Sequence, residues 1–114
     1  MDRISIDDVE PSEAADDVYL ALLAGGDEMN VQHFRIEPGA SVPVHDHPHE
    51  QVGYIVAGEL TFVAGDDGEE IVVGPGDSYS LAGGEPHGAE NRGDETVIGI
   101  DVFSPPRDNP PWMD

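Results

Sequence analysis

Three of the five histidines fall within five residues, a spacing that suits metal binding. They are His45, His47 and His49, and Gln51 follows two residues later. Side chains on an extended strand alternate between its two faces, so these four share one face unless Pro48 interrupts the count. Two imidazoles at positions i and i+2 on one side of a strand can hold one metal ion. We therefore interpret this stretch as the main half of a metal site.

A second group of residues with chemical potential lies near the end of the chain. Asp101 and Phe103 have the same parity in a predicted strand, and Arg107 follows a bend at residues 105–106. We interpret them as a pocket rim, in which Asp101 transfers a proton, Phe103 forms a wall and Arg107 holds a carboxylate in its fork. The alternative is a solvated Asp101, a core Phe103 and an Arg107 paired with one of the many acids.

Short apolar segments separated by Gly and Pro turns must position these residues. The predicted strands cover Val18–Ala24, Met29–Glu37, Val52–Ala57, Leu60–Ala64, Glu70–Val73, Ser78–Ala82, His87–Asn91 and Thr96–Phe103. Gly58-Glu59 is predicted to join two of them as a hairpin, and Pro11–Leu23 has room for one helical turn. Strands of this length and spacing indicate an all-β sandwich or barrel.

The length of 114 residues predicts one domain, over residues 1–114. Residues 1–15 are expected to form an arm or edge strand, and the proline-rich tail, residues 104–114, to lack regular structure. Trp112 in that tail is expected to pack as part of the terminus. The sequence has no apolar run long enough for a membrane span and no secretory signal pattern, so a cytoplasmic location is the default expectation.

The charge balance is strongly acidic, with 25 Asp and Glu residues against four Arg and no Lys. Such a surface repels nucleic acid and anionic membranes, so neither is expected as a partner. The acids are spread along the whole chain and not gathered in a tail. This distribution favours a salt-loving source and a requirement for molar salt, although an acidic face that keeps the protein soluble is the simpler alternative.

Two ordered motifs in the chain resemble those of the cupin family. The first family motif is Gly, five residues, His-x-His, three or four residues, Glu, six residues, Gly. It is matched by Gly39, His45, His47 and Gly58, with Gln51 in place of the glutamate. The second is matched by Gly76, Gly84, His87 and Asn91, with Ala82 in place of a proline. The resemblance covers residues 38–91 and implies a cupin double-stranded β-helix, which is a small jelly-roll barrel.

The resemblance also implies that one metal ion is held in the barrel mouth by His45, His47, Gln51 and His87. Parity favours Gln51 over Glu50 as the oxygen donor. Three neutral imidazoles and an amide add no negative charge, so the ion stays a strong Lewis acid with open positions for substrate. The chain has no cysteine, and this donor set suits nickel, zinc, iron(II) or manganese.

The two remaining histidines receive other interpretations. His49 is expected at the rim or in solvent. His33 is expected to be structural, with a place inside the barrel as the alternative.

The Gln-containing ligand set beside Asp101, Phe103 and Arg107 resembles the pectin-degradation cupins, which ketonise unsaturated uronates. That resemblance implies an enzyme converting 4,5-unsaturated galacturonate or mannuronate to 5-keto-4-deoxyuronate, with the three residues in catalytic or substrate-binding roles. The alternatives are a metal-dependent dioxygenase and a non-catalytic cupin that binds a small sugar acid. Cupins commonly pair through their flat sheets, so a homodimer is expected.

Overall fold

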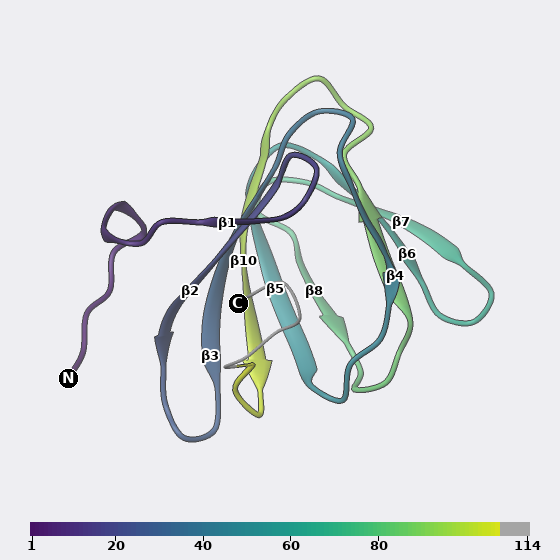
Figure 1. The fold of residues 1–114 in the computed structure, drawn as a ribbon. Helices are drawn as coiled ribbons and strands as arrows, with labels where there is room; N and C mark the ends of the chain where they lie inside the picture. The colour runs from purple at the N-terminus through teal and green to yellow at the C-terminus, as the bar shows by residue number, and fades with distance from the viewer. Residues whose placement is uncertain (108–114) are drawn as a thin grey trace.

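The computed structural model describes residues 1–107, which form two antiparallel sheets facing each other (Figure 1). A short 3-10 helix, η1 (Ile6–Asp8), precedes the strands. These are β1 (Ser12–Ala15), β2 (Val18–Gly25), β3 (Asn30–Ile36), β4 (Ser41–His45), β5 (Glu50–Ala57), β6 (Leu60–Ala64), β7 (Glu69–Val73), β8 (Ser78–Leu81), β9 (His87–Glu90) and β10 (Val97–Ser104). The all-β class is therefore confirmed, and no helix among residues 1–107 could cross a bilayer.

The larger sheet has the strand order β1-β2-β3-β10-β5-β8, and the smaller has the order β4-β9-β6-β7. The segment expected as an arm or edge strand, residues 1–15, contains η1 and then β1, which lies at the edge of the larger sheet. A helical turn within Pro11–Leu23 is wrong. Ser12 pairs with Leu20 across a tight turn at Asp17, whose φ is 60°, so this segment satisfies its backbone hydrogen bonds by strand pairing instead.

The predicted hairpin at Gly58-Glu59 is also wrong. β5 pairs with β10 and β8 in the larger sheet, whereas β6 pairs with β7 and β9 in the smaller one. Gly58 has a φ of 78°, and a Cβ there would lie 2.7 Å from the Thr96 carbonyl oxygen. The chain therefore uses this glycine to cross between sheets, which closes the barrel where a hairpin would have extended one sheet.

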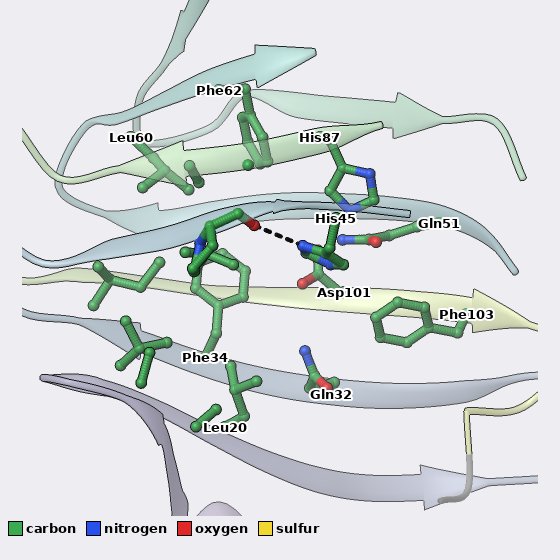
Figure 2. A pocket seen from close by; sticks show the side chains of 18 of the residues that line it. Leu20, Gln32, Phe34, His45, Gln51, Leu60, Phe62, His87, Asp101 and Phe103 are labelled. Carbon is green, nitrogen blue, oxygen red and sulfur yellow. Dashed lines mark hydrogen bonds between the residues drawn. The ribbon is translucent and has the colours of Figure 1, made fainter. Parts of the chain in front are cut away.

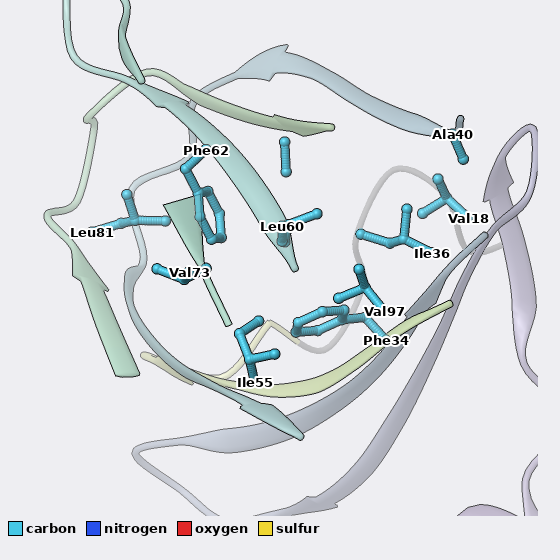
Figure 3. Close-up of a cluster of buried hydrophobic side chains, with 11 residues drawn as sticks. Val18, Phe34, Ile36, Ala40, Ile55, Leu60, Phe62, Val73, Leu81 and Val97 are labelled. Atoms are coloured by element: carbon cyan, nitrogen blue, oxygen red, sulfur yellow. The ribbon is translucent and has the colours of Figure 1, made fainter. Parts of the chain in front are cut away.

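Apolar side chains from both sheets meet inside the barrel (Figure 3). Their burial follows the period of two, as in β3, where Phe34 and Ile36 are buried and Arg35 is exposed. The cluster consists of Val18, Phe34, Ile36, Ala40, Ile55, Leu60, Phe62, Val73, Leu81, Ala89 and Val97. Burying each large member contributes about 1.5–3 kcal/mol. This core fills one end of the barrel and holds the strands that carry the polar residues at the other end (Figure 2).

Candidate metal centre and cavity

Three histidines from three segments converge at the open end of the barrel. His45 ends β4 and His87 begins β9, and the strand register makes them direct neighbours. His47 lies in the connection between β4 and β5. One nitrogen of each ring lies within 4.8 Å of the others, which is a separation that a single metal ion can bridge.

Each of these imidazoles is held by a hydrogen bond from its Nδ1 atom to a backbone carbonyl. The distances are 2.9 Å from His45 to Pro43, 3.1 Å from His47 to His49, and 2.9 Å from His87 to Glu85. A carbonyl oxygen only accepts, so Nδ1 carries the proton in each ring, and Nε2 of the neutral imidazole keeps its lone pair. This is the usual arrangement behind metal-binding histidines, where the second hydrogen bond fixes tautomer and orientation.

Gln51 directs its amide oxygen at the same point. Its amide nitrogen donates to Asp101, which leaves Oε1 facing Nε2 of His47 at 3.1 Å. With the proton on Nδ1 of His47, both facing atoms are electron-pair donors. Two buried acceptors opposed in this way are costly unless a cation lies between or beside them. The donor set therefore fits a divalent metal ion.

Burial keeps His47 and His87 neutral, which is the form that binds metal. Burial first, and then the charges of Arg107 and of the neighbouring His87, lower the pKa of His47 to about 4. The pKa of His87 is lowered in the same way, mainly by burial. Metal binding by these two rings therefore does not compete with protons near neutral pH.

Glu50 and His49, the other two residues of this stretch, lie outside the cluster. β4 ends at His45 and β5 begins at Glu50, so the histidines do not share one strand face as the simple parity count suggested. Glu50 is exposed while Gln51 is 5% exposed, which agrees with the preference for Gln51 as the inward residue. The ring of His49 contacts those of His47 and Phe103 at the rim.

His33 lies among the outward-facing residues of β3, opposite Ile100. The alternative that placed it inside the barrel is therefore wrong, because strand alternation sends its neighbours Gln32 and Phe34 inward instead.

Asp101 is buried beside the metal ligands and is 6% exposed. It stands in a row across the larger sheet, between Gln32 of β3 and Gly53 of β5, with Tyr79 of β8 beyond Gly53. Tyr79 donates a hydrogen bond across Gly53 to Asp101. A Cβ on Gly53 would lie 2.2 Å from the Tyr79 hydroxyl and 2.5 Å from Oδ1 of Asp101, so only glycine leaves room for this bond.

Burial raises the pKa of Asp101 to about 6, against the opposing effects of the hydrogen bonds from Tyr79 and Gln51 and of the Arg107 charge. Burial and the Asp101 charge raise the pKa of Tyr79 far above its usual range, so the tyrosine keeps its proton and remains a donor. A carboxyl group with a pKa near neutrality can give or take a proton under physiological conditions.

Phe103 and Arg107 lie together next to this carboxylate. The Phe103 ring is 1% exposed, and the Arg107 guanidinium lies 5.4 Å from its centroid. The backbone N–H of Arg107 donates to Oδ1 of Asn30 at 2.7 Å, which fixes the segment after β10 against β3. The prediction for Trp112 falls outside the described residues.

These side chains surround a cavity of about 460 Å³ in the barrel mouth. Figure 2 shows that its two ends differ: His45, His87, Gln51, Asp101 and Phe103 lie at one end, and Leu20, Phe34, Leu60 and Phe62 at the other. The volume suits a small molecule, and the polar end combines a metal-binding cluster, a titratable carboxyl and a cation.

Three residues of this site were not predicted from the sequence, namely Gln32, Gly53 and Tyr79. The signals were present but weak. Gln32 shares the parity of Phe34 and Ile36 in a predicted strand, and Gly53 is an isolated glycine inside an apolar strand, which indicates a close approach by another group. Tyr79 has the inward parity of Leu81 in β8.

Residues 32–103 match the family model described as the cupin domain. The chain belongs to the cupin family. This match includes every proposed metal ligand and Asp101, and the jelly-roll barrel implied by the sequence motifs is confirmed. The donor geometry described above therefore lies in a fold whose members commonly hold a metal ion.

Several known proteins resemble this cupin. It is 34% identical over 67 residues to H2HPP isomerase of Bacillus subtilis. The aligned segment covers 59% of this chain but only 28% of that protein. The polyketide cyclase RemF of Streptomyces resistomycificus is 28% identical with a TM-score of 0.81, covering 91% of this chain and 79% of that chain. KdgF from Halomonas sp. has a TM-score of 0.83 at 24% identity, and the match covers 95% of this chain and 96% of that chain. This similarity shows a shared fold.

Proposed function

We propose that this cupin is a metal-dependent isomerase that moves a proton within a small carboxylate-bearing substrate. The observation that carries the proposal is the position of Asp101. Its buried carboxyl is hydrogen-bonded to Gln51, which faces the histidine cluster, and it lines the same cavity as Arg107. A proton-transfer group and a carboxylate-binding group thus lie beside a Lewis-acid site.

The proposed roles follow from the chemistry of each side chain. His45, His47, His87 and Gln51 would hold the ion, which supplies charge stabilisation to an oxygen of the substrate. Arg107 binds the substrate carboxylate. Burial lowers the pKa of Arg107, the charge of Asp101 raises it in opposition, and the guanidinium remains cationic. Asp101 moves the proton, and Phe103 forms the wall against which the substrate ring lies.

The specific substrate proposed is 4,5-unsaturated galacturonate or mannuronate, and the product is 5-keto-4-deoxyuronate. Opening of the cyclic enol ether releases an enol that becomes the ketone after one proton moves to carbon. Substrate and product are isomers, so the reaction needs no second substrate. The spacing of Asp101, Phe103 and Arg107 and the presence of Gln51 among the metal ligands support this choice.

We expect metal-loaded protein to remove the ultraviolet absorbance of freshly made 4,5-unsaturated galacturonate. Replacing Arg107 with alanine should raise KM by about 10–100-fold, because a charge-assisted hydrogen bond to the carboxylate is lost. The matched control is Arg92→Ala, since Arg92 binds Glu70 and Glu90 on the surface. The experiment follows the initial rates of all three proteins over a range of substrate concentrations.

If the KM of Arg107→Ala equals that of the control, Arg107 does not bind the substrate. No absorbance loss with the unaltered protein would reject the uronate reaction. Oxygen consumption with iron but not with nickel or zinc would then favour a dioxygenase. Binding of the sugar acid without turnover would favour a non-catalytic cupin.

We also propose a homodimer formed through the outer face of the larger sheet. Val52, Tyr54 and Val56 of β5 are 45%, 46% and 56% exposed. The outward positions of the adjacent central strands are Ile98, Ile100 and Val102 on β10, and Val31, His33 and Arg35 on β3. None of these nine positions carries a carboxylate, in a chain of net charge −21. We propose that the same face of a second copy of the chain covers this patch in a symmetric dimer.

Size-exclusion chromatography with light scattering should give a dimer mass, and Tyr54→Glu should give a monomer, because the new carboxylates would face each other in an apolar contact. Val72→Glu is the matched control, since Val72 is 61% exposed on the smaller sheet. Raising the salt concentration should strengthen the dimer by screening the repulsion between acidic chains. An unchanged mass for Tyr54→Glu would reject this interface.

A further inference from the structure

A buried amide without a partner lies in the cavity wall, outside the roles assigned so far. Gln32 is 3% exposed and lines the cavity, and its Oε1 atom has no hydrogen-bond partner among the described residues. On the same face of β3, Nδ2 of Asn30 is also buried without a partner. Buried polar groups are nearly always hydrogen-bonded in folded proteins, so an orphan donor and an orphan acceptor two residues apart on one strand face need an explanation.

The position of Gln32 connects it to the proposed chemistry. Its Cα is paired in register with that of Asp101, so the two side chains are direct neighbours on the inner face of the sheet. In Figure 2 the Gln32 side chain rises from β3 with its amide nitrogen pointing toward Asp101 and the metal-binding end of the cavity. Tyr79 and Gln51 already engage Asp101 from the β5 side. Gln32 approaches from the opposite side, where the substrate would lie.

Other cavity residues near Gln32 do not complete its hydrogen bonding. Toward the closed end, the neighbours Leu20 and Phe34 are apolar and offer no donor or acceptor. An amide presents both N–H donors and a carbonyl acceptor. A ligand hydroxyl can accept from the first or donate to the second, so it pairs with either end of the group.

We propose that Gln32 is a substrate-binding residue that selects a hydroxyl-bearing acid, through a hydrogen bond to a substrate hydroxyl next to Asp101. The inference deepens the proposed function, since it concerns the substrate of the same site, but it does not depend on the reaction catalysed. The hydroxyl and Arg107 would fix two points of the ligand, with the apolar Phe103 ring between them. Acids of similar size that lack hydroxyls leave the amide unsatisfied and bind more weakly.

The test compares two stable six-membered-ring acids, D-galacturonate and cyclohexanecarboxylate, by calorimetric titration of zinc-loaded protein. Gln32→Leu should weaken galacturonate binding about tenfold and leave cyclohexanecarboxylate binding unchanged or stronger. Its Tm should stay the same or rise, because the variant replaces an unsatisfied buried amide with an apolar group of similar size. A residue that is needed only for folding would lower the Tm and show no preference between the acids.

Leu20→Ala is the matched control, because it removes apolar contact from the neighbouring cavity wall. It should weaken cyclohexanecarboxylate binding at least as much as galacturonate binding. Equal losses for both acids in Gln32→Leu, or no galacturonate binding by the unaltered protein, would overturn the proposal. Selective loss in a protein that fails to convert the unsaturated uronate would support the binding role of Gln32 and reject only the reaction.

Discussion

Replacing His87 with alanine is expected to abolish specific metal binding and, with it, turnover. His87 supplies one of the three nitrogens that lie within 4.8 Å of one another, and its Nδ1–H is held by the Glu85 carbonyl. Loss of a group that only orients a ligand costs roughly 10–100-fold in metal affinity, and loss of the ligand itself should exceed about 100-fold. Titration with nickel or zinc, followed by elemental analysis of dialysed protein, measures the effect.

The matched control is His33→Ala. His33 lies on the outer face of β3, so this variant removes an imidazole without touching the cluster. Its metal content and affinity should equal those of the unaltered protein. Equal metal affinity in His87→Ala and His33→Ala, with both proteins folded, would contradict the proposed site. A site shared by His45, His47 and Gln51 alone would give that result.

Replacing Asp101 with asparagine is expected to lower kcat by about 10²–10⁴-fold while the metal stays bound. Asparagine has nearly the same shape, and its amide oxygen still accepts from Tyr79, so the side chain keeps its place beside Gln51. It cannot take part in proton transfer, however. Rates of ketonisation at saturating substrate, together with metal content, separate the two effects.

Asp94→Asn is the control for the loss of one negative charge, since Asp94 is exposed in the loop before β10. It should leave kcat unchanged. An Asp101→Asn protein that retains full kcat would show that another group moves the proton. A protein that has lost its metal would instead assign Asp101 to ligand orientation.

The same substitution gives a stability signature whose sign follows from the raised pKa. Burial raises the pKa of Asp101 to about 6 in the folded state, whereas the unfolded chain ionises near the ordinary value of 3.8. The unfolded state therefore releases its proton first, so this group lowers the stability of the native protein as pH rises from about 4 to about 6. The Asp101→Asn variant has no carboxyl at this position, so its stability does not decrease with pH for this reason. Denaturant unfolding of the metal-free proteins should show the variant gaining relative stability across that range.

The sequence predicted much of the site because cupin motifs are local. His45 and His47 stand at fixed spacing in one stretch, and His87 at fixed spacing in another, so both halves of the metal cluster could be predicted without knowing how they meet. Asp101, Phe103 and Arg107 could be grouped because alternation along one strand and a short bend keep them together. The all-β class likewise followed from period-two patterns and Gly/Pro turns.

Errors in the prediction arose where a choice depends on contacts distant in sequence. Gly58-Glu59 has the composition of a hairpin turn, but the next strand pairs with β9 and β7, and the burial of Leu60 in the barrel decides that pairing. Pro11–Leu23 has no local preference strong enough to exclude a helical turn. Its pairing to β3 through β2 decides its conformation.

By itself the sequence determined the residue types at the site, the neutrality of the donor set and the strongly acidic surface, since these depend on composition and spacing. Only the tertiary structure decided which atoms meet. Cross-strand register aligns Gln32, Asp101, Gly53 and Tyr79, whose positions in the chain are far apart. The backbone carbonyls that fix each imidazole, and the burial that raises the pKa of Asp101, likewise exist only when the barrel closes, because hydrogen bonding and desolvation depend on neighbours in space.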